Sequence, residues 1–152
     1  MRGVVGYLVA VGIVGSLLTW GAVKMARGIR NNNPLNIERT GEQWRGMSAQ
    51  QSDSRFVVFD QPVYGIRAAA RILKSYQRRG IQNIAGIVST WAPAHENDTA
   101  AYISVVEQRA RISRNQYLTE ADYPAVIAAM IYMENGEQPY PLELIQEGVN
   151  LA

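Results

Sequence analysis

Glu134 is the acidic side chain whose position in the sequence most strongly suggests chemistry. It falls on a helical stripe of residues, at spacings of three and four, that is otherwise apolar. The other members of this stripe are Tyr123, Ile127, Met130 and Ile131. Asn135 and Gly136 follow directly and predict the end of the helix, so Glu134 lies at the negative end of the helix dipole. The dipole and the apolar neighbours both disfavour the charged form, so we expect a raised pKa.

A carboxyl group that stays protonated near neutral pH suits the general acid of a glycosidase. The other interpretation is that Glu134 reaches solvent at a frayed helix end, or pairs with an arginine such as Arg67 or Arg71. Periodicity alone leaves both open.

A second group of candidate residues lies in the polar stretch between Trp91 and Tyr102. Aromatic faces pack on sugar rings, and carboxylate and amide side chains hydrogen-bond hydroxyl and acetamido groups. The polar candidates of this stretch are Glu96, Asn97 and Asp98. In the competing interpretation Asp98 is a helix N-cap, Glu96 complements the helix dipole and Trp91 belongs to the core.

The third group is an asparagine-rich loop, RNNNPLNI, over residues 30–37. Asn32, Asn33 and Asn36 could line a polar cleft, or could satisfy the backbone of a tight loop. Spacing does not decide between these roles.

The elements that would position these residues are mostly helical. Helical periodicity begins after Asp60 and Pro62, resumes after Gly80 until Pro93, and begins again at Asp98 or Thr99. A capping pair, Thr119 and Asp122, precedes the helix that carries Glu134, and Pro141 opens a last short helix. Residues 28–60 predict a loop region whose one strand-like run, residues 56–59, could form a hairpin.

The N-terminal segment is apolar throughout. Residues 3–23 carry no charge, and 21 residues in a helix span about 30 Å, the hydrocarbon thickness of a bilayer. The segment is longer than the apolar part of a signal peptide and no clear cleavage motif follows. We therefore expect a transmembrane anchor over residues 1–26, whose small residues could also allow self-association, and one helical domain over residues 27–152.

Composition excludes several classes of site. There are no cysteines and one histidine, so neither a disulfide framework nor a metal site is expected, and no cofactor is implied. The net charge is +2 and no basic block is interleaved with aromatic residues, so we expect no specific nucleic-acid binding.

The same stretches resemble a known protein family. RGIRNNNPLNIE, FVVFDQPVYGIRAAARIL, IVSTWAPAHENDTAAYI and AAMIYMENGEQPY, in this order over about residues 27–150, resemble a family of virion-associated phage proteins. Members are similar to lysozyme-like peptidoglycan hydrolases. The resemblance implies a lysozyme-like domain that acts on bacterial peptidoglycan.

A fainter likeness to bacterial wall glucosaminidases implies an unusual chain order. NNNPLNI resembles their N-x-F-G-I strand and WAPAHENDTAAYI resembles their Y-A-T-D-P-x-Y-A loop, but residues 1–37 lack the acid that precedes that strand. IAAMIYMENGE instead resembles the A-x-A-I-L-E-S-G-W helix of such hydrolases, with Glu134 at the catalytic position. The chain would then be a circular permutation of the lysozyme-like fold.

The sequence therefore predicts a mostly α protein with an N-terminal transmembrane helix and a small lysozyme-like domain containing a short β/loop region. We expect a lytic transglycosylase or a lysozyme-type muramidase that cuts between N-acetylmuramic acid and N-acetylglucosamine when the phage enters or leaves the cell. Glu134 would be the acid and Glu96 or Asp98 its partner. The substrate-binding candidates are Asn32, Asn33, Asn36, Trp91, Asn97, Asp98 and Tyr102.

The alternative is an inactive structural membrane protein of a phage particle that docks on the cell wall or on other virion proteins. Either protein would be single-pass, in the virion, its membrane or the host inner membrane.

Overall fold

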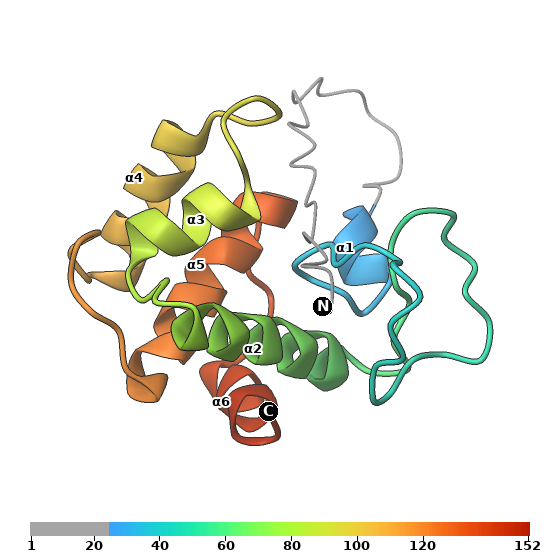
Figure 1. The fold of residues 1–152 in the computed structure, drawn as a ribbon. Coiled ribbons are helices and arrows are strands. Elements are labelled where there is room, and N and C mark those ends of the chain that lie inside the picture. The colour runs from blue at the N-terminus through green and yellow to red at the C-terminus, as the bar shows by residue number, and fades with distance from the viewer. Residues whose placement is uncertain (1–24) are drawn as a thin grey trace.

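The computed structural model describes residues 25–152, which form a mostly helical domain (Figure 1). It contains a short helix α1 and five longer helices, with a single 3-10 turn η1 before α5. Their bounds are α1 Arg27–Arg30, α2 Pro62–Arg78, α3 Ile84–Trp91, α4 Thr99–Ala110, η1 Glu120–Asp122, α5 Tyr123–Asn135 and α6 Leu142–Asn150.

Local signals in the sequence set the boundaries of α4 and α5 as predicted, whereas α1 was not predicted and α3 begins at Ile84, after an Asn83 cap that was missed in the sequence. Asp98 caps α4 by accepting a hydrogen bond from the backbone N–H of Ala101 at 3.0 Å. Thr119 and Asp122 form the expected capping box before α5. Gly136 ends α5 in the left-handed conformation, at φ 75°, which glycine adopts without steric cost.

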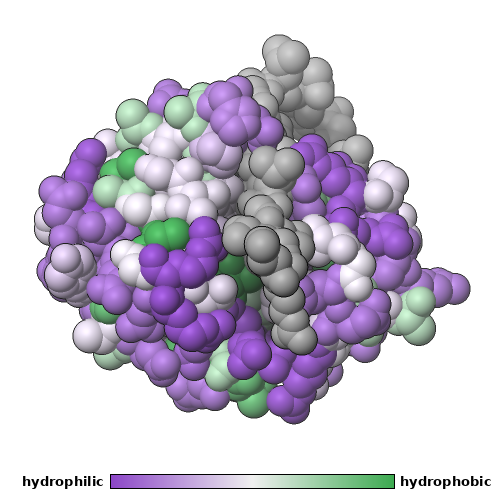
Figure 2. All heavy atoms as spheres, in the orientation of Figure 1, coloured by the Kyte–Doolittle hydropathy of each residue, from purple (hydrophilic) through white to green (hydrophobic). Residues whose placement is uncertain are grey.

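Helix α5 is the centre of the domain, since it packs against α1, α2, α4, α6 and η1. Figure 1 shows α5 running behind α2 and α3, with α6 below α2. The side chains of Trp91, Tyr102 and Met130 are fully enclosed in this core. Figure 2 shows a largely hydrophilic surface with small, separate hydrophobic spots on the face in view. The apolar faces of the helices are therefore used inside the domain.

The loop between α1 and α2 is held by scattered contacts and not by a hairpin. The strand-like run at residues 56–59 makes two isolated antiparallel bridges, from Phe56 to Glu38 and from Phe59 to Met47. No strand forms in the part of the chain that the structure describes. Val57 also donates its N–H to the carbonyl of Ile37 at 2.9 Å. Phe56, Val57 and Phe59 are buried, so most of this run belongs to the core.

The structure corrects one part of the predicted fold class, the transmembrane helix. No helix within residues 25–152 is long and apolar enough to cross a bilayer, so a fold that includes a transmembrane helix is wrong for the described protein. The segment of residues 3–23 on which that prediction rested lies outside the described residues. The predicted division at residues 26 and 27 depends on the same segment and stays a prediction.

Candidate functional site around Glu134

Glu134 lies in the last turn of α5 with only 7% of its surface exposed. Both of its carboxyl oxygens have a hydrogen-bond donor. The Asn36 Nδ2 donates to Oε2 at 3.0 Å, and the Tyr102 hydroxyl donates to Oε1 at 3.0 Å. Three segments that are far apart in the sequence, the asparagine-rich loop, α4 and α5, therefore meet at one carboxyl group.

Burial raises the pKa of Glu134 to about 7, because the carboxylate is removed from water. The hydrogen bonds from Asn36 and Tyr102, and a contact with the Trp91 indole, act in the opposite direction by stabilising the ionised form. The Trp91 Nε1 is buried and has no hydrogen-bond partner of normal geometry. Of the three side chains, Trp91 therefore lowers the pKa of Glu134 the least. The site thus holds an acid poised to lose or gain its proton near neutral pH.

No arginine neutralises Glu134 among residues 25–152. Arg67 donates its Nε to the carbonyl of Leu151 at 2.9 Å. Neither Arg67 nor Arg71 forms an ion pair with Glu134, so the interpretation in which the acid pairs with an arginine is wrong.

Asn36 is the asparagine of the loop that reaches the acid. Its backbone is left-handed, at φ 52°, which turns its side chain toward α5. Its Oδ1 is buried without a hydrogen-bond partner and faces the Cα of Gly28, where an added Cβ would come within 2.8 Å of it. Helix α1 therefore lies close to Asn36, the residue that donates a hydrogen bond to Glu134.

The other asparagines of the loop serve its backbone. The Asn33 side chain is fully buried, donates to the carbonyls of Ile37 and Val57, and accepts from the N–H of Ile37. Asn32 donates to the carbonyl of Phe59 at 3.0 Å. The structure gives these two residues a positioning role, and the predicted contact with substrate stays untested.

The polar loop after α3 is set apart from Glu134. Glu96 is exposed and lies 3.2 Å from His95, Asn97 donates to the carbonyl of Pro93 at 3.2 Å, and Asp98 caps α4. Glu96 is not among the groups that shift the pKa of Glu134. Of the predicted site residues, the structure brings together Asn36, Trp91, Tyr102 and Glu134.

Two residues that hold this site were missed in the sequence. The Asn135 Nδ2 donates to the carbonyl of Pro34 at 2.7 Å, which ties the end of α5 to the asparagine-rich loop. Gly28 allows α1 to approach, since an added Cβ would lie 2.7 Å from the Asn135 Oδ1. A helix-terminal asparagine beside an asparagine-rich loop is a weak signal, and nothing in the sequence pairs Gly28 with it.

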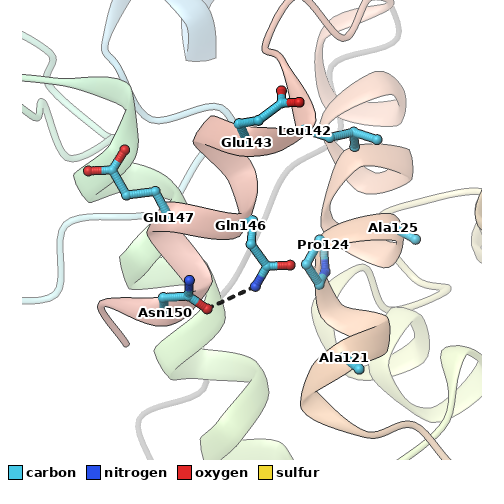
Figure 3. A pocket seen from close by; sticks show the side chains of 8 residues that line it. All are labelled: Ala121, Pro124, Ala125, Leu142, Glu143, Gln146, Glu147 and Asn150. Carbon is cyan, nitrogen blue, oxygen red and sulfur yellow. Dashed lines mark hydrogen bonds between the residues drawn. The ribbon is translucent and has the colours of Figure 1, made fainter.

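A cavity of about 570 Å³ lies away from this site, at the opposite end of α5. Ala121, Pro124 and Ala125 line it from η1 and the start of α5, and Leu142, Glu143 and Glu147 line it from α6 (Figure 3). Glu134 does not line it.

Fold and site together define a small helical domain built around a buried glutamate whose pKa is raised to about 7. Over 127 aligned residues the chain is 50% identical to "Protein P5" of Pseudoalteromonas phage PM2. The aligned region covers 81% of this chain and 79% of that protein. The chain therefore belongs to the family of this phage protein, and the predicted phage origin of the family is confirmed. No known family profile matches the chain. These comparisons say nothing about a lysozyme-like domain, which stays a prediction.

Proposed function

We propose that this phage protein acts in the virion as a peptidoglycan-cleaving enzyme, with Glu134 as the catalytic acid. The observation that carries the proposal is the state of Glu134, a buried acid whose pKa is raised to about 7 and whose two oxygens are fixed by Asn36 and Tyr102. A glycosidic oxygen is a poor leaving group unless it is protonated as the C–O bond breaks, and an acid of this pKa supplies that proton near neutral pH.

The surroundings of Glu134 favour a reaction with one acid. The groups that shift its pKa are Asn36, Tyr102 and Trp91, none of which is charged. A two-carboxylate hydrolase keeps its two acids within about 5 to 10 Å of each other, where they would influence one another's pKa. In the one-acid reaction Glu134 protonates the leaving oxygen, and the 6-hydroxyl of the muramic acid then attacks its own C1. Glu134 regains its proton from that hydroxyl, leaving a 1,6-anhydro end.

The burial of Glu134 places a condition on this reaction. At 7% exposure the carboxyl group meets a glycan only if a covering segment moves.

A second candidate function is an inactive virion protein that docks on the wall or on other virion proteins. The same hydrogen bonds favour it, because Asn36 and Tyr102 satisfy both oxygens of Glu134 and join three segments of the fold. In this case Glu134 is a structural residue.

Digestion of purified peptidoglycan by the full-length protein tests the proposal. We expect wild type to release muropeptides with anhydro ends, identified by mass, and Glu134→Gln to lose at least about 100-fold in rate. Glu137→Gln is the matched control, because Glu137 lies three residues further on and is exposed.

Other outcomes decide against parts of the proposal. Reducing ends would show a hydrolase. Activity that survives Glu134→Gln but is lost in Glu96→Gln would assign the acid to Glu96. A folded wild-type protein that binds the wall without cutting it would establish the structural protein.

A further inference from the structure

Charge is distributed very unevenly along this chain. All 15 lysines and arginines lie within residues 1–114, whereas residues 115–152 contain six Asp and Glu residues and no basic residue. Because α5 and α6 belong to that acidic part, the surface that they form carries only negative charge.

The cavity between the start of α5 and α6 belongs to this acidic part, and we call it the acidic groove. Its floor is apolar, with Pro124, Ala125 and Leu142, and the Leu142 side chain is 59% exposed. Glu143 and Glu147 line it from successive turns of α6, and no basic residue lines it. In Figure 3 the Gln146 side chain points across the groove toward Pro124. An apolar floor beside two carboxylates suits a cationic partner with aliphatic stems.

The complementary surface lies on α2 and the loop before it, where Arg67, Arg71 and Arg45 form what we call the arginine cluster. Arg67 and Arg71 are one turn apart on α2, and the Arg45 guanidinium lies 5.8 Å from the ring centre of Tyr64, which is three residues before Arg67. Burial lowers the pKa of Arg67, and the positive charges of Arg71 and Arg45 lower it further, so both of these arginines repel Arg67. None of them forms an ion pair with a carboxylate within residues 25–152.

We propose that the arginine cluster of one copy of this protein docks into the acidic groove of a second copy. Glu143 and Glu147 are four residues apart on α6, and Arg67 and Arg71 are four residues apart on α2, so the two helices present opposite charges at the same spacing. The arginine stems cover the apolar floor while their guanidinium groups reach the two carboxylates.

A second copy fits these surfaces better than an unrelated polyanion. A phosphate polymer would neutralise the arginine cluster but leave the apolar floor and exposed Leu142 uncovered. The two surfaces differ, so the contact is heterologous, and each bound copy leaves one groove and one cluster available for the next. Repeated contacts then build chains or rings, a form of assembly suited to a protein of the virion.

Sedimentation of the full-length protein at low and high salt tests this inference. We expect oligomers at 50 mM NaCl and a shift toward monomer at 500 mM, because salt screens the exposed charges. Glu143→Lys combined with Glu147→Lys, or Arg45→Glu combined with Arg71→Glu, should each weaken self-association by about tenfold or more. All four residues are exposed, and Arg67 keeps its bond to Leu151.

Mixing the two variants gives the sharpest outcome. The lysine variant keeps its arginine cluster and the glutamate variant keeps its acidic groove, so an equimolar mixture restores the wild-type contact between unlike copies. The reversed groove and the reversed cluster also carry opposite charges, so the mixture should regain oligomers that neither variant forms alone. All four substitutions in one chain should restore self-association. A wild-type protein that stays monomeric at low salt would overturn the inference. So would variants that associate like wild type, or a mixture that stays as dissociated as the separate variants. Circular dichroism of each variant checks that it is folded.

Discussion

Glu134 accepts a hydrogen bond from Asn36, a residue 98 positions earlier in the chain. This contact joins the end of α5 to the loop after α1 and fixes one oxygen of a carboxyl group whose pKa is raised to about 7. Stability and the proposed chemistry therefore depend on the same proton.

We expect the stability of this protein to fall as the pH rises from about 4.5 to about 7. The folded state binds the proton of Glu134 more tightly than the unfolded chain, whose glutamate has a pKa near 4.5. The free energy of unfolding should therefore decrease by about 3 kcal/mol over this range and stay constant above it. Urea unfolding at pH 5 and pH 8 measures the difference. Glu134→Gln should reduce it below about 1 kcal/mol, whereas His95→Asn should leave it as in wild type.

Tyr102→Phe should raise the pKa of Glu134 further above 7. The lost hydroxyl group donates a hydrogen bond to Oε1, and that bond stabilises the ionised carboxylate more than the neutral acid. The variant should also lose about 1 kcal/mol of stability. A ¹³C NMR titration of glutamate side-chain carboxyl groups reads the pKa directly. Tyr117→Phe is the control because that side chain is 75% exposed, and a Glu134 titration unchanged by Tyr102→Phe would contradict the geometry.

Gly28→Ala should destabilise the protein by about 2 kcal/mol, although alanine normally favours a helix. The new Cβ would lie 2.7 Å from the Asn135 Oδ1 and 2.8 Å from the Asn36 Oδ1. Thermal unfolding compares it with Gly41→Ala, where no neighbouring atom lies within 4 Å and only the left-handed backbone is strained. Equal losses in the two variants would show that α1 does not pack closely on this site.

Asp53→Asn should cost about 2 kcal/mol at pH 7. Asp53 accepts hydrogen bonds from the Arg27 side chain at 2.7 and 2.6 Å and from Asn31 at 2.8 Å. The bond from Arg27 is the main reason that the pKa of Asp53 lies far below its usual range. Because this pKa is depressed, its contribution is present above pH 4 and is lost as the pH falls below it.

Urea unfolding at pH 7 and pH 3 checks this contribution of Asp53. Wild type should lose more stability between these two conditions than Asp53→Asn does. Glu38→Gln, which removes the more exposed ion pair with Arg55, should cost under about 1 kcal/mol. A loss in the control as large as in Asp53→Asn would rule out the special role of Asp53.

What the sequence by itself determined is local. The cap at Asp98, the capping box before α5 and the glycine after it are encoded within a few residues, so the start of α4 and both ends of α5 were predictable. The stripe at helical spacing placed Glu134 on the apolar face of α5, but periodicity alone left open whether its carboxyl group is buried, reaches solvent or pairs with an arginine.

What only the tertiary structure decided is which distant side chains meet. Four asparagines of the loop look alike in the sequence, yet Asn33 bonds the backbone and Asn36 reaches Glu134, because the left-handed turn at Asn36 redirects its amide. The strand-like run at residues 56–59 has high β propensity but finds only two bridging partners. Contacts across 98 residues depend on how helices pack as rigid bodies, and no local pattern specifies that packing.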